Sequence, residues 1–207
     1  NPSTGPDTYN GYYNMHHSLP NASWSPGTGK YRCLVDLMGH EDLGGKTLLY
    51  MVDGLFGGYY WDSFPEKWDM EPFNGHWPSS LFLSMDPVAI DSVCYDFLRE
   101  EWPEKVHYGG SAQSLKGGAE DYLHEAALAD NPVSGTFYDP ENDGISMQSL
   151  GAHEHWNNAK DKLYSRNMGT GNGIELVKVE SSNAAPYVDA GQTKVIYFET
   201  DNPYTLQ

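Results

Sequence analysis

A strand that passes directly into a helix, within residues 80–98, constrains the fold of this chain more than any other feature. Residues 80–85 form a short run with strand character, and Asp86 followed by Pro87 is typical of a helix N-cap and first helical position. The apolar residues that follow recur at helical spacing: Ile90, Val93, Cys94, Phe97 and Leu98. The pattern predicts an amphipathic helix that packs on a sheet.

Strands and helices alternate along the rest of the sequence. Residues 47–52, 174–179 and 195–199 are predicted strands, and the first of these is an uninterrupted apolar run that predicts burial on both faces. Helices are predicted around Leu34, Leu37 and Met38, over 120–129 with Tyr122, Leu123, Ala126 and Ala127 as packing face, and over 156–164. The order predicts an α/β fold with a mixed sheet, helices packed on it, long irregular aromatic loops and extended termini.

The 207 residues are enough for one complete core. Residues 1–29 are rich in Asn, Ser, Gly, Pro and Tyr without periodicity, so we expect an irregular N-terminal segment there. Residues 30–180 are the predicted α/β domain, and 181–207 are a linker-like segment followed by a terminal strand.

Acidic residues outnumber basic ones, with 29 Asp and Glu against 12 Lys and Arg and a formal net charge of -17. This charge repels phosphate backbones, so we expect no nucleic-acid partner. No apolar run approaches the length of a membrane-spanning helix, about 18 residues, so no membrane span is expected. The acidic surface suits cationic ligands or divalent metals, or else it is a solvated face that favours solubility.

Three features predict an extracellular or periplasmic glycoprotein. They are the sequon Asn21-Ala22-Ser23, the low lysine content, and the abundance of Tyr, Trp and Gly that is typical of secreted proteins facing sugars. In an oxidising compartment Cys33 and Cys94 could pair, and the alternative is two buried free thiols.

Several stretches together resemble the C-terminal half of domain-of-unknown-function family 362: residues 34–47, 52–55, 80–93, 122–127 and 150–156. The resemblance covers about residues 30–180 and implies a poorly characterised α/β domain, attached to iron-sulfur ferredoxin modules in some relatives and exported in others. It supplies no catalytic mechanism. Such proteins usually carry another N-terminal half, and this chain also lacks a cysteine set for a cluster.

The sharpest candidate site is His153-Glu154-His155. In an extended chain, residues i and i+2 share one face, so both imidazoles could ligate one divalent metal, with His40, His124 or an aspartate completing a zinc-type site. A calcium alternative exists at residues 139–144, which imitate the first half of a calcium loop. The twelfth position there is Leu150, so the bidentate ligand is missing and a plain turn is favoured.

Three carboxylates are candidate catalytic groups: Asp53, Asp86 and Glu154. Asp53 and Asp86 each follow a predicted strand, where α/β sheets gather ligands and catalytic groups. Asp86 is equally explained as an N-cap, and Asp53 before Gly54 as a turn residue.

The loop between the first two predicted strands is rich in aromatic residues. Those expected to stack on sugar rings are Tyr60, Trp61, Trp68 and Trp77. The alternative is that these side chains pin the loop to the core.

Two functions compete on these grounds. One is an extracytoplasmic, metal-dependent hydrolase or lyase that acts on glycan-like substrates. The other is a non-catalytic glycan-binding or assembly subunit, which contacts neighbouring subunits through its aromatic loop and extended tails.

Overall fold

The computed structural model describes residues 8–9, 12–13, 31–59, 63–103, 119–180 and 194–199. The chain divides into two compact units. The first unit comprises Asn1–Lys46 and His107–Ser149, and the second comprises Thr47–Val106 and Leu150–Gln207.

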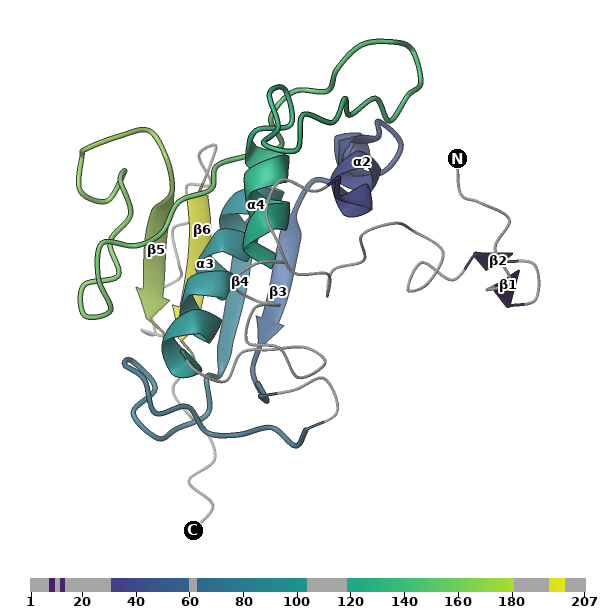
Figure 1. Ribbon diagram of the computed structural model, residues 1–207. Helices are drawn as coiled ribbons and strands as arrows, with labels where there is room; N and C mark the ends of the chain where they lie inside the picture. Colours follow the sequence, from purple (N-terminus) through teal and green to yellow (C-terminus); the bar gives the residue numbers. More distant parts are fainter. Residues whose placement is uncertain are drawn as a thin grey trace. The chain divides into compact units, whose positions relative to one another are not determined.

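The second unit contains a four-stranded sheet with the order β3-β4-β6-β5 (Figure 1). Its strands are β3 (Tyr50–Gly54), β4 (Ser80–Ser84), β5 (Glu175–Glu180) and β6 (Lys194–Glu199). β4 pairs antiparallel with β3 and with β6, whereas β5 and β6 are parallel. The predicted mixed sheet of an α/β fold is therefore confirmed.

Helix α3 (Pro87–Glu101) packs on this sheet (Figure 1). As predicted, the Asp86 side chain caps the helix, accepting a hydrogen bond from the Ala89 N–H at 2.8 Å. The predicted apolar stripe is buried against an aromatic cluster that includes Trp68, Phe73, Phe82 and Trp102. Burying a large apolar side chain stabilises a fold by about 1.5–3 kcal/mol, so this cluster holds the helix to the sheet.

Strand β3 corrects one prediction, because it is not buried on both faces. Met51 and Asp53 are exposed while Tyr50 and Val52 face the core. Among the described strands β3 pairs only with β4, so it is an edge strand with one face toward α3. An apolar run is ambiguous between these two situations.

The helix predicted over residues 156–164 is also wrong, since this stretch forms turns. The Asn157 side-chain oxygen accepts hydrogen bonds from the N–H groups of Asn158 and Leu163. The Asn158 oxygen accepts from those of Lys160 and Asp161. Asparagine side chains thus bond to the backbone N–H groups that a helix would need.

The first unit contains α2 (Cys33–Gly39), the 3-10 turn η1 (Gly44–Lys46) and α4 (Glu120–Ala127). A short antiparallel pair, β1 (Thr8–Tyr9) and β2 (Tyr12–Tyr13), precedes them. The side chains that α4 buries are Asp121, Leu123 and Glu125, so the apolar packing face expected for this helix is only partly correct.

A buried polar network explains this difference. Arg32 donates from Nε to Asp121 Oδ2 at 2.7 Å, and both side chains are at most 1% exposed. The Tyr138 hydroxyl accepts from the Arg32 N–H at 3.0 Å and donates to Glu125 Oε2 at 2.8 Å. Each buried charge has a partner, which is the condition for burying it at tolerable cost.

Both cysteines carry free thiols in this structure, with Cys33 in the first unit and Cys94 in the second. Burial raises the pKa of the Cys94 thiol, with the nearby Asp91 adding to the shift. No helix among the described residues is long and apolar enough to cross a membrane. Most of the N-terminal segment 1–29 and the tail beyond β6 lie outside the described residues.

The Arg32–Asp121 pair yields a stability prediction. We expect Asp121→Ala to lower the free energy of unfolding by about 3–5 kcal/mol, because Arg32 is left charged and unpaired in the interior. The double variant Arg32→Met/Asp121→Leu should recover most of this loss. Urea unfolding measures both, with the exposed Asp130→Ala as control. An Asp121→Ala loss no larger than that of Asp130→Ala would contradict the prediction.

Candidate functional site: two imidazoles held by helix α3

The segment of residues 151–156 is fixed to α3 at three points. Asp86 Oδ2, at the start of the helix, accepts from the Ala152 N–H at 3.0 Å. Further along, Ser92 Oγ lies 2.8 Å from His153 Nδ1. Asp96 Oδ1 lies 2.7 Å from His155 Nδ1. These contacts follow the same order along the helix and along the segment, so the segment runs parallel to α3.

The spacing of the helix matches the spacing of the segment beside it. Ser92 and Asp96 are four residues apart on one helical face, which corresponds to a rise of about 6 Å. Two residues of extended chain advance about 6.6 Å, so His153 and His155 reach the two partners in turn. Their ring centroids lie 5.1 Å apart, and the two imidazoles therefore share one face, as the alternation predicts.

Ser92 determines the tautomer of His153. The serine hydroxyl donates its single proton to the Val88 carbonyl oxygen at 2.7 Å. Ser92 Oγ can then only accept from the imidazole, so Nδ1 of His153 carries the proton. In the neutral ring the lone pair is left on Nε2, the atom that can ligate a metal or take up a proton.

Asp96 has the same effect on His155 through a carboxylate. This carboxylate is 2% exposed, and a carboxylate only accepts, so His155 Nδ1 donates to it. Its other oxygen, Oδ2, accepts from the Trp156 N–H at 3.0 Å and from the Tyr164 hydroxyl at 2.9 Å. Burial, together with the negative charge of Asp96, raises the pKa of Tyr164, so the phenol remains a donor. In the neutral ring, the lone pair of His155 is again on Nε2.

Asp86, a candidate catalytic residue, has a structural role in this geometry. One oxygen caps α3 and the other holds Ala152, the residue before His153. A Cβ atom on Gly151 would lie 1.9 Å from Asp86 Oδ1, so only glycine permits this approach. Burial raises the pKa of Asp86, although hydrogen bonds from the backbone of Ala89, Ala152 and Val88 oppose the shift.

The other two candidate carboxylates are also bound by the backbone. Glu154 Oε1 accepts from the Ser165 N–H at 3.2 Å, from the Ser165 hydroxyl at 3.0 Å and from the Ile174 N–H. Glu154 thereby anchors the loop that leads into β5. Asp53 is exposed and accepts from the Leu55 N–H at 2.9 Å, which is a turn contact.

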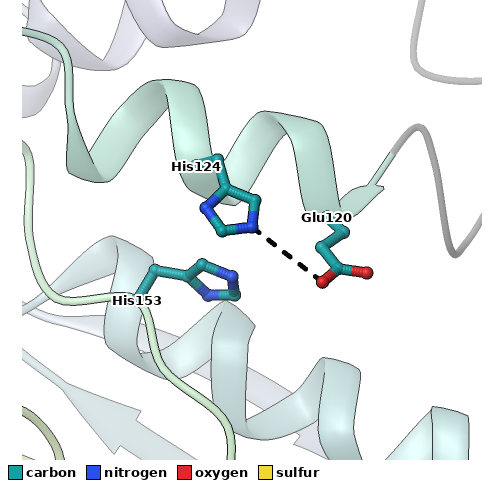
Figure 2. A group of neighbouring side chains, drawn as sticks. All are labelled: Glu120, His124 and His153. Carbon is teal, nitrogen blue, oxygen red and sulfur yellow. Dashed lines mark ion pairs between the residues drawn. The ribbon is translucent and has the colours of Figure 1, made fainter. Parts of the chain in front are cut away.

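The first unit carries the other two histidines expected as metal ligands. His40 Nδ1 accepts from the Asp42 N–H at 3.0 Å, and its Nε2 lies 3.6 Å from Glu141 Oε2. On α4, His124 Nε2 lies 3.9 Å from Glu120 Oε1, one helical turn earlier (Figure 2). Figure 2 also labels His153, which belongs to the second unit.

The aromatic candidates differ in their surroundings. Trp68 is 7% exposed and packs edge to face against Phe73 and Trp102, so it belongs to the core. Trp77 meets Phe56, which is 59% exposed, edge to face with ring centroids 5.2 Å apart. Tyr60 and Trp61 lie outside the described residues.

Residues 139–144, which imitate the first half of a calcium loop, form a turn, as predicted from the absence of a bidentate ligand at position 150. Both Asp139 carboxylate oxygens accept backbone hydrogen bonds, from Asp143 at 3.0 Å and from Gly144 at 2.9 Å.

The residues that sequence reasoning missed are Ser92, Asp96, Tyr164 and Glu120. The available signal was the polar pair Ser92 and Asp96, spaced i, i+4 among the apolar positions of the helix. Buried polar side chains require partners, so Ser92 and Asp96 had to meet donors or acceptors from another segment.

No protein-family model, curated protein or solved structure significantly matches this chain.

The hydrogen bonds around the two imidazoles predict their tautomers. At alkaline pH both rings should carry the proton on Nδ1, as read from long-range nitrogen–proton NMR correlations. In Ser92→Ala the acceptor for His153 is lost, so its Nε2-protonated form should become populated while His155 is unchanged. A native His153 already protonated on Nε2 would contradict the assignment.

Proposed function

We propose that this chain is an extracytoplasmic, metal-dependent hydrolase or lyase domain that acts on glycan-like substrates, with His153 and His155 as metal ligands. One observation carries the proposal: Ser92 and Asp96 on α3 bond to Nδ1 of the two neighbouring rings, so in the neutral imidazoles Nε2 is the nitrogen that can ligate a metal. Metal-ligating histidines commonly have this support behind them, with the second ring nitrogen bonded to a carboxylate or another acceptor.

The donor atoms favour zinc over calcium. Imidazole nitrogen suits zinc and other late first-row metals, whereas calcium takes oxygen ligands. Two ligands on one segment would leave positions for further protein groups and for water. A zinc ion held there would lower the pKa of a bound water to about 7 and so would supply a nucleophile for hydrolysis at neutral pH.

An exposed aromatic ring packed beside a partly buried one supports a glycan as substrate. Phe56 is largely exposed beside Trp77, and flat apolar faces suit the apolar side of a sugar ring. The same pair favours a second candidate, a glycan-binding or assembly module without catalysis. Membership of family 362 and export from the cytoplasm stay predictions from the sequence.

Zinc titration of the purified chain tests the proposed ligands. Calorimetry should show a site whose affinity falls at least about 10-fold in both His153→Ala and His155→Ala, because each variant removes a coordinating nitrogen. His76→Ala is the matched control, since His76 is exposed and pairs through its main chain. Equal binding by all four proteins would eliminate these ligands, and an absence of zinc binding would leave the glycan-binding module ahead.

Asp96 offers a separate test through its effect on His155. In Asp96→Asn the amide NH₂ would face His155 Nδ1 and drive the ring proton to Nε2, so zinc affinity should fall about 10–100-fold. The NMR tautomer signature of His155 should invert in the same variant. A purely structural role for Asp96 would lower the melting temperature and leave the tautomer unchanged.

A further inference from the structure

Helix α4 carries a second pair of side chains with metal-ligand chemistry. Glu120 and His124 are four residues apart, and their Oε1 and Nε2 atoms lie 3.9 Å from each other (Figure 2). The side chains are 26% and 45% exposed, respectively, so both remain accessible to an ion from solvent. Residues at this spacing lie one above the other on a helical surface.

We infer that Glu120 and His124 together ligate a divalent cation. Zinc bonds to carboxylate oxygen and imidazole nitrogen are about 2.0–2.2 Å long, which places two ligands of a tetrahedral site about 3.4 Å apart. The observed separation needs to close by about half an ångström to reach this value. Rotation of the partly exposed Glu120 side chain is sufficient for that movement.

The surroundings on α4 single out Glu120 among its carboxylates. Asp121 is bound to Arg32 in the interior, and Glu125 accepts from Ser134 and Tyr138. Both are therefore committed to the buried network, whereas Glu120 is directed at His124. Glu120 also lies in the first turn of α4, where the helix dipole favours an anionic side chain.

An ordinary ion pair is the competing explanation of the same geometry. A solvent-exposed pair at i, i+4 stabilises a helix by only about 0.3–0.5 kcal/mol and requires a protonated imidazole. Metal ligation requires the neutral imidazole instead, so the two explanations differ in what binds His124 Nε2 at neutral and alkaline pH. The inference concerns α4 alone and does not depend on the proposed function of His153 and His155.

A zinc titration of the full chain, followed through the ring nitrogen resonances of His124, tests the inference. His124→Ala identifies these resonances by their loss. In the native chain zinc should shift the Nε2 resonance of His124, and in Glu120→Gln the same shift should require at least about 10-fold more zinc. Circular dichroism should show unchanged helix content, because glutamine is also a good helix former.

Asp130→Asn is the matched control, because it removes one exposed negative charge just beyond α4 and leaves Glu120 in place. This variant should titrate like the native chain. A His124 Nε2 resonance that zinc does not shift would overturn the inference. Identical titrations of Glu120→Gln and the native chain would also overturn it. Loss of the shift in Glu120→Gln, together with an unchanged His124 shift in His153→Ala, would support a site on α4 that does not require His153.

Discussion

Helix α3 is held on the sheet by burial of its apolar face, and the positions of both imidazoles depend on that burial. Ile90, Val93 and Phe97 are at most 3% exposed. Burying each such side chain contributes about 1.5–3 kcal/mol, against about 1 kcal/mol for a typical hydrogen bond. The apolar contacts therefore place the helix, and the hydrogen bonds of Ser92 and Asp96 then orient the rings.

Polar groups specify geometry in both units because none of them can be buried cheaply without a partner. Asp96 accepts from a ring nitrogen, a backbone N–H and a hydroxyl, and these bonds fix both His155-Trp156 and Tyr164 against α3. Arg32 plays the corresponding part in the first unit through Asp121 and Tyr138. These contacts add little net stability, but they exclude alternative packings in which the same groups would be unpaired.

The spacing i, i+4 serves different purposes on the two helices. On α3 it places Ser92 and Asp96 against the Nδ1 atoms of His153 and His155, so the helix orients two side chains that belong to another segment. On α4 it brings Glu120 and His124 together directly. The difference follows from burial: Ser92 and Asp96 are at most 2% exposed and serve as internal acceptors, whereas the α4 pair remains accessible to solvent.

The sequence by itself determined the local elements of this protein. Helix α3 was predicted from its first residue because capping by Asp86 and apolar periodicity are local properties, and His153 and His155 were placed on one face by simple alternation. Only the tertiary structure decided that β3 is an edge strand and what the two histidines contact. Ser92 and Asp96 lie 61 and 59 residues before their imidazole partners. Hydrogen bonds across such separations depend on which distant segments pack together, and the local sequence pattern does not identify the partner segment.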